Sequence, residues 1–156
     1  MSLDAFFQIG ETITLGSHTF TAGEIKAFAA KYDPQRFHMD EREAENSVFG
    51  ALCASGWHTA STWMKYNLTR RQDTVEQAWE GTGKRPQFGP SPGIANLKWL
   101  KPVYAGETIT FTRKALAHRA LASRPGWRIL TILCGAHDAD GKPVLEFESS
   151  VLVMTD

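Results

Sequence analysis

Two side chains that can move a proton stand five positions apart in the segment 33–38, which reads DPQRFH. On a continuous helix, Asp33 and His38 would point to different faces. Pro34 argues against such a helix, because a proline biases the residue before it toward an extended backbone. A tight irregular loop can then aim both side chains into one pocket. An Asp and a His that face one cavity are the minimal set for moving a proton on and off a bound substrate or water.

The same residues have simpler interpretations, which their spacing alone leaves open. An aspartate before a proline is commonly a turn or helix-stop residue, and a loop histidine is commonly a surface or hydrogen-bonded side chain. A metal site through Asp33, His38 and Asp40 is a further alternative, since carboxylate and imidazole are ordinary ligands. No second histidine lies at a spacing that would complete such a site, so we predict no metal.

The residues before this segment predict a helix that delivers Asp33 at its end. Thr21 and Glu24 have the spacing of a capping box, which predicts a helix start at Thr21. The apolar residues that follow recur at helical spacing and form one stripe: Ile25, Phe28, Ala29 and Tyr32. Asp33 comes directly after them, and Asp40 is the expected cap of a shorter turn that runs through Ala44.

A longer, central helix is expected from residues 55–56 to the basic pair at 70–71, which suits a helix C-terminus. Its apolar face is expected to consist of Trp57, Ala60, Ser61, Met64 and Leu68. His58 lies on the same helix and is interpreted as a packed or exposed histidine rather than as a second base.

The pattern changes after this helix. Residues 73–93 are rich in glycine and proline and lack a period, which predicts a long connecting loop. Beyond the loop, Ile109 and Phe111 alternate with threonines. A period of two predicts β-strands, so the second half of the chain is expected to form a sheet. The same period occurs in Leu145, Phe147, Val151 and Val153.

Two short signals indicate how the strands connect. Asp140 and Gly141 separate the runs 129–137 and 144–154, and both residue types tolerate a positive φ, so a hairpin is expected there. Pro102 cannot donate to a ladder, which places the strand before it at an edge or a bulge. Helices followed by antiparallel strands predict an α+β fold in which the sheet covers one helix.

The composition sets the outer limits. The chain has 156 residues, 42% of them hydrophobic, which suits a single domain (1–156) with its own core. Its 17 basic and 17 acidic residues cancel, so no overall field favours nucleic acid or an anionic membrane. Cys53 and Cys134 are too few for a disulfide framework, and we expect free, buried thiols. No signal-like start and no apolar run of about 20 residues occurs, so we expect a cytoplasmic protein with no membrane partner.

Three blocks of the sequence together resemble one protein family. Residues 32–40 (YDPQRFHMD), 54–58 (ASGWH) and 97–107 (LKWLKPVYAGE) come in the order found in the MaoC-like dehydratases, which include the (R)-specific enoyl-CoA hydratases. The blocks span most of the chain. The resemblance implies a hotdog fold, in which a curved antiparallel sheet wraps a long central helix, and it implies that two copies pair as a homodimer.

The resemblance also implies a reaction. Asp33 and His38 fall at the family's catalytic positions, and Gly56 falls where a backbone N–H at the start of the central helix binds the thioester carbonyl. Water would add to the double bond of a trans-2-enoyl thioester, with coenzyme A as the expected carrier and an (R)-3-hydroxyacyl thioester as the product. A helix N-terminus suits this role, because its unpaired N–H groups stabilise the enolate oxygen. No cofactor is expected beyond the coenzyme A of the substrate.

Further substrate-binding residues are expected around the start of the central helix: Ser55, Trp57 and Met64. The family has a small polar residue at the position that aligns with Met64, and Ser55 stands where the better-known hydratases have histidine. We therefore expect a distinct acyl preference, in which the bulk of Trp57 and Met64 favours short or branched chains. The candidates for binding coenzyme A phosphates are Lys84, Arg85, Lys98 and Lys101. Three tryptophans are expected to serve packing: Trp79, Trp99 and Trp127.

Two other functions stay open on the same fold. Hotdog thioesterases often take a carboxylate from the central helix, and residues 56–72 contain neither Asp nor Glu, which counts against a thioesterase. A non-catalytic module that only binds acyl thioesters has no need of Asp33 and His38. Their presence favours the hydro-lyase.

Overall fold

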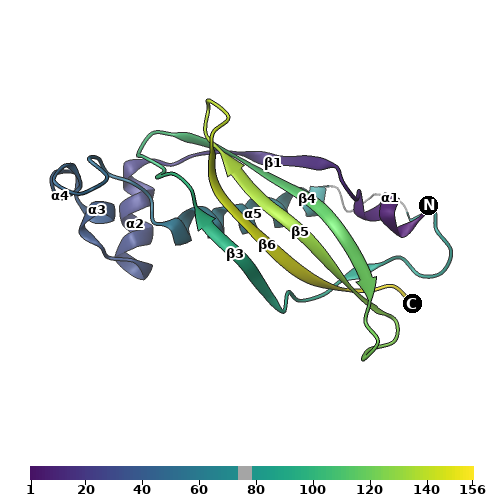
Figure 1. Cartoon of the computed structure of the whole chain (residues 1–156). Helices are drawn as coiled ribbons and strands as arrows, with labels where there is room; N and C mark the ends of the chain where they lie inside the picture. Colours follow the sequence, from purple (N-terminus) through teal and green to yellow (C-terminus); the bar gives the residue numbers. More distant parts are fainter. Residues whose placement is uncertain (74–78) are drawn as a thin grey trace.

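The computed structural model describes residues 1–73 and 79–156 and has an α+β architecture, as predicted (Figure 1). Its helices are α1 (Leu3–Phe7), α2 (Ala22–Tyr32), α3 (Arg36–Met39), α4 (Glu41–Glu45) and α5 (Gly56–Asp73). Its strands are β1 (Thr12–Thr19), β2 (Gln87–Phe88), β3 (Gly93–Trp99), β4 (Thr108–Ala120), β5 (Trp127–His137) and β6 (Pro143–Met154). The part of the predicted loop at 74–78 lies outside the described residues.

The strands form one curved antiparallel sheet that wraps the long helix α5 (Figure 1). Its order is β1-β4-β5-β6-β2, and β3 also pairs with β6. The predicted hairpin is confirmed: β5 and β6 flank a turn in which Gly141 has φ +80°. The predicted edge position is also confirmed for β3, whose pairing with β6 is interrupted between Ala95 and Lys98, although Pro102 itself lies beyond the strand.

The signals around Asp33 are confirmed. The Thr21 hydroxyl accepts from Glu24 N at 3.2 Å, and the Glu24 carboxylate accepts from Thr21 N at 3.2 Å, which is the capping box. Helix α2 ends at Tyr32, so Asp33 is its C-terminal cap residue and Pro34 follows. Asp40 caps α4 by accepting from Glu43 N at 2.9 Å. The stripe prediction was wrong at its end, because Tyr32 is 70% exposed.

The face of α5 that packs on the sheet is not the face predicted. Trp63 is 1% exposed, and its Nε1 donates to Thr112 O of β4 at 2.8 Å. Most of the predicted face is exposed on the single chain, with Trp57, Met64 and Leu68 at 53%, 42% and 46% exposure, whereas Ala60 is partly buried against the core.

Threonines explain this difference. Thr59 and Thr62 are buried on the sheet side of α5. Because threonine counts as polar, a search for a hydrophobic stripe does not assign these two residues to the buried face. Their hydroxyls donate to the helix's own carbonyls, Thr59 to Gly56 O at 2.8 Å and Thr62 to His58 O at 2.7 Å. A hydroxyl satisfied in this way exposes mainly its methyl group to the core, so both residues pack as small apolar side chains.

Helix α1 and strand β1 were not predicted, and β1 has a local reason. Its pairing with β4 shifts register between Thr14 and Gly16, which breaks the alternation of apolar and polar residues. Gly16 has φ +145°, and a Cβ at this position would lie 2.6 Å from the Tyr66 ring of α5. The bulge therefore lets α5 approach the edge of the sheet closely.

We expect Gly16→Ala to lower the free energy of unfolding by about 1–3 kcal/mol, because the methyl group would overlap Tyr66 and the backbone conformation disfavours a side chain. Urea denaturation followed by circular dichroism measures this. Gly23→Ala is the matched control: this glycine lies in α2 with open space around it, so the change should be neutral or slightly stabilising. Equal stability of the two variants would contradict the close approach.

Candidate active site

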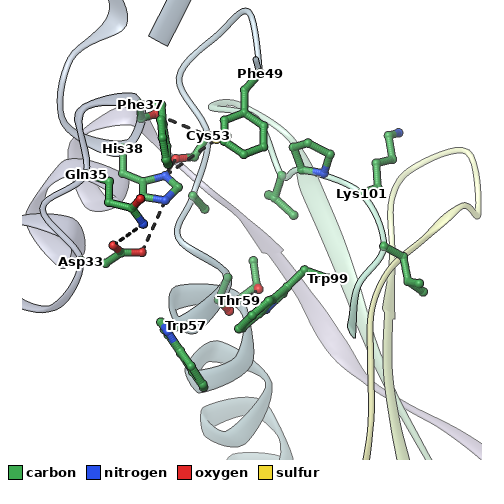
Figure 2. Close-up of a pocket in the computed structure, with 15 residues that line it drawn as sticks. Asp33, Gln35, Phe37, His38, Phe49, Cys53, Trp57, Thr59, Trp99 and Lys101 are labelled. Carbon is green, nitrogen blue, oxygen red and sulfur yellow. Dashed lines mark hydrogen bonds and ion pairs between the residues drawn. The ribbon is translucent and has the colours of Figure 1, made fainter. Parts of the chain in front are cut away.

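The segment 33–38 brings its two titratable side chains together, although not as the irregular loop that we expected. Residues 33–35 are followed directly by the short helix α3, which begins at Arg36. This turn of helix aims the His38 ring back toward Asp33, so that Nε2 lies 3.4 Å from Asp33 Oδ2 (Figure 2). Both side chains line the same cavity.

The hydrogen bonds of His38 define its tautomer. Nδ1 lies 2.6 Å from the carbonyl oxygen of Cys53, and His38 is 5% exposed. Because a carbonyl only accepts, Nδ1 must carry the hydrogen in the neutral ring, which leaves the Nε2 lone pair facing Asp33. The neutral ring therefore presents a proton acceptor to the cavity.

Two donors fix the orientation of the Asp33 carboxylate. Oδ1 accepts from Gln35 Nε2 at 2.8 Å, and Oδ2 accepts from Ser55 Oγ at 2.7 Å. Ser55 is fully buried, and its hydroxyl also accepts from Trp57 N at the start of α5 at 3.3 Å. The Ser55 hydroxyl lies on Asp33 and outside the cavity lining, and a contact of Ser55 with substrate stays a prediction. Its spacing from Asp33 in the sequence carries no signal of the bond between them.

The cavity has a volume of about 400 Å³ and mainly apolar walls (Figure 2). Of the predicted site residues, Asp33, His38, Gly56 and Trp57 line it. Met64 lies outside this lining, on the exposed face of α5, and its contact with substrate stays a prediction. The larger side chains of the lining that sequence analysis did not assign to the cavity include Phe37, Phe49, Cys53, Trp99, Leu100 and Val103.

Gly56 is the first residue of α5 and faces the cavity. Its N–H donates to no group within the described part of the chain, as is typical of a helix start. A Cβ at Gly56 would lie 2.3 Å from Cε2 of the Trp99 ring, so only glycine fits beneath this indole. The helix start therefore presents a bare backbone donor to the cavity.

His58 packs between aromatic rings, in agreement with its interpretation as a packed histidine. Its ring stacks on Phe28 at a centroid distance of 4.6 Å and meets Phe20 edge-on at 5.0 Å. Burial lowers the pKa of His58, which favours the neutral ring. His58 does not line the cavity.

Lys101 is the one candidate for phosphate binding that lines the cavity. Its ammonium pairs with the buried carboxylate of Asp138 in the β5–β6 turn. Hydrogen bonding between them lowers the pKa of Asp138 and raises that of Lys101. Asp138 Oδ1 also accepts from Asp140 N and Lys142 N at 3.0 and 2.9 Å, so the turn is organised to hold this wall of the cavity.

No group of three or more His, Cys, Asp or Glu side chains in residues 1–73 and 79–156 is arranged to hold a metal ion. Asp40, which completed the alternative metal site, caps α4 instead. Within the same ranges, no helix is both long and apolar enough to cross a bilayer.

No protein-family model matches the chain, but individual proteins do. YdeM of Bacillus subtilis (strain 168), an uncharacterised protein, is 27% identical over 153 residues, which are 98% of this chain and 99% of that protein. The crystal structure of a MaoC-like dehydratase from Rhodospirillum rubrum is 30% identical, with a TM-score of 0.76 over 95% of this chain and 93% of that one. The (R)-hydratase of A. caviae involved in PHA biosynthesis shares the fold at 22% identity, with a TM-score of 0.62 over 95% of this chain and 96% of its own.

The curved sheet around α5 is thus a hotdog fold, as the sequence blocks implied. Since the identity to the Rhodospirillum rubrum protein extends over nearly the whole of both chains, the chain belongs to the MaoC-like dehydratase family.

Cys53 is a thiol neighbour of the site that sequence analysis did not connect with it. Its Sγ lies 3.8 Å from His38 Nδ1, and burial raises its pKa to about 11. Because this pKa is far above neutrality, only about 10⁻⁴ of the Cys53 side chains carry a thiolate at neutral pH. Cys134 is also buried, and burial raises its pKa as well.

We therefore expect both thiols to resist iodoacetamide in the native protein at neutral pH and to react once the protein is unfolded in guanidinium. The labelling rate of Cys53 should rise about tenfold per pH unit toward alkaline pH, as the thiolate fraction grows. Mass spectrometry of labelled peptides measures each site, with Cys53→Ser and Cys134→Ser to assign the signals. Rapid labelling of native Cys53 at neutral pH would contradict the raised pKa.

Proposed function

We propose that the protein is a hydro-lyase that reversibly adds water to the double bond of a trans-2-enoyl-CoA and yields the (R)-3-hydroxyacyl-CoA. The observation that carries this proposal is the meeting of three groups at one cavity: the Asp33 carboxylate, the Nε2 lone pair of His38, and the unpaired N–H of Gly56. The names of the related Rhodospirillum rubrum dehydratase and the A. caviae (R)-hydratase agree with this reaction and with its handedness.

The first step is attack by water. Asp33 Oδ2 and His38 Nε2, 3.4 Å apart, both accept hydrogen bonds and together hold one water molecule. As the water oxygen bonds to C3 of the substrate, His38 Nε2 takes the proton, and the adjacent Asp33 carboxylate stabilises the imidazolium that forms. The bond from Nδ1 to Cys53 O keeps the ring in place throughout.

The second step is proton return. Electrons from the double bond pass to the thioester oxygen, where an enolate charge develops beside the Gly56 N–H and the positive end of the α5 dipole. The imidazolium then gives its proton to C2, so hydrogen and hydroxyl have been added and His38 is neutral again. The reverse sequence dehydrates the 3-hydroxyacyl thioester.

Thioester hydrolysis is the alternative that the site supports less well. It needs a nucleophile or a carboxylate from the central helix, and residues 56–72 supply neither Asp nor Glu. The one thiol of the cavity, Cys53, is held protonated by burial. A purely binding module would not need the acceptor pair that Asp33 and His38 form.

Asp33→Asn and His38→Asn should each lower kcat for hydration of crotonyl-CoA at least about 100-fold, since each removes a proton-transfer group while keeping its size or its main hydrogen bond. In the His38→Asn variant, the side-chain amide N–H takes the place of Nδ1 toward Cys53 O, so folding should be preserved. Loss of the conjugated double bond, followed by absorbance, measures the rate. Chiral analysis of the product tests its handedness.

Glu45→Gln is the control, because Glu45 is exposed on α4, away from the cavity. It should retain the activity of the unmodified protein. Release of free coenzyme A without hydration would favour the thioesterase instead. Full activity in both site variants would remove Asp33 and His38 from the mechanism.

We also propose that the working form is a homodimer. Strand β3 pairs only with β6 among the described strands and leaves its other edge open. Large apolar side chains are exposed on β3 and on α5, and the Trp57 and Trp99 rings link the two elements at a centroid distance of 5.0 Å. This apolar strip comprises Trp57, Met64 and Leu68 of α5 with Ile94 and Trp99 of β3. A second copy would bury the strip and pair the open edge.

Light scattering after size-exclusion chromatography should give twice the 17.3 kDa of one chain. Ile94→Lys and Leu68→Lys should shift the mass toward the monomer, because a charge would be buried in the interface. Val48→Lys serves as the control, since Val48 is 92% exposed and lies outside the strip. A monomeric unmodified protein would contradict the proposal.

A further inference from the structure

Trp99 occupies an unusual place at the start of α5. It is the last residue of β3, and its backbone is fixed by pairing with Leu145 and by the bond from Leu100 N to Val144 O at 2.9 Å. From there its indole reaches over Gly56, and the position of a Cβ at Gly56 lies 2.5 Å from Nε1 and 2.3 Å from Cε2. The nitrogen-bearing ring is therefore the part of Trp99 that covers the helix start.

The indole N–H has no protein acceptor within the part of the chain that the structure describes. The Nε1 atoms of Trp63 and Trp79 donate to backbone carbonyls, at 2.8 Å to Thr112 O and at 3.2 Å to Gly83 O. Trp99 lines the cavity, so a molecule bound there lies beside its indole. Trp57 and Trp127 also lack an acceptor for Nε1 in the described residues, so the place of the Trp99 donor beside the start of α5 is what points beyond a packing role.

We propose that the Trp99 indole N–H is a second hydrogen-bond donor to the substrate carbonyl oxygen, beside the Gly56 N–H. The Cα–Cβ bond of a helical residue is tilted toward the helix N-terminus, where its N–H also points, and Nε1 lies 2.5 Å from the Cβ position of Gly56, so the two donor nitrogens are neighbours at the helix start. Two donors on one oxygen stabilise the enolate more than one does. The inference rests on the proposed hydratase function and adds a specific residue to it.

The arrangement explains why Gly56 and Trp99 depend on each other. Any side chain at position 56 would push the indole off the helix start, while leaving the backbone N–H of that residue in place. Gly56→Ala therefore tests the tryptophan without removing the backbone donor. The losses from Gly56→Ala and Trp99→Phe should be less than additive, because both remove the same contact.

The main experiment compares Trp99→Phe with the unmodified protein in crotonyl-CoA hydration. Phenylalanine keeps an aromatic wall but lacks the N–H, so kcat should fall about 10- to 100-fold. KM should rise by only about 3- to 10-fold, because the bond to the ground-state carbonyl is weaker than the bond to the enolate. Trp127→Phe, a tryptophan of β5 outside the cavity lining, is the matched control and should keep its activity. Unchanged kcat in Trp99→Phe would overturn the inference and leave the proposed function standing.

A binding measurement separates this inference from the reaction itself. Butanoyl-CoA has the thioester carbonyl but no double bond, and S-butyl-CoA lacks the carbonyl. Calorimetry should show that the unmodified protein prefers the thioester and that Trp99→Phe reduces this preference about 3- to 10-fold. This result supports the carbonyl contact even if crotonyl-CoA is not hydrated, in which case only the proposed function fails. An equal preference in both proteins would overturn the inference.

Discussion

The hydrogen bond from Ser55 Oγ to Asp33 Oδ2 joins the two segments on which the site depends. Asp33 follows the last residue of α2, and Ser55 precedes α5. The bond therefore joins the two ends of the segment that contains α3 and α4. A second bond across the same gap, from His38 Nδ1 to Cys53 O, runs parallel to it. The bond of His38 is buried and that of Ser55 is partly buried, and in such places a polar contact is strong and its loss is costly. Together they set the carboxylate and the imidazole beside the start of the central helix, at the cavity.

The central helix α5 has one face that packs on the sheet and an opposite face that is exposed on the single chain. On the sheet side, Thr59 and Thr62 turn their hydroxyls back to the helix and allow close packing beside Trp63. On the opposite side, large apolar residues remain exposed on the single chain. Exposed apolar side chains do not stabilise an isolated domain. Such a patch is typical of a surface that is buried against another molecule. The cavity lies between the start of α5 and Trp99, the last residue of β3.

Local signals predicted local structure well. The capping box, the helix stop before Pro34 and the turn at Gly141 each depend on neighbouring residues, and each is present. Contacts between distant residues could not be derived in this way: nothing in the sequence indicates that Ser55 holds Asp33 or that Trp99 covers Gly56. The face of α5 was misjudged because buried threonines do not look apolar in a sequence. Strand β1 was missed because its bulge at Gly16 interrupts the period that identifies a strand.

The wall of the cavity at residues 99–103 is attached to the fold at several points. Lys101 pairs with Asp138, Leu100 N donates to Val144 O, and Val103 O accepts from Ala54 N at 2.8 Å. These attachments use backbone groups or a side chain that points to the β5–β6 turn, whereas the side chain of Leu100 is 48% exposed and lines the cavity. For protein engineering, this separation makes position 100 a place where side-chain size can be varied to change the shape of the cavity without loosening the scaffold.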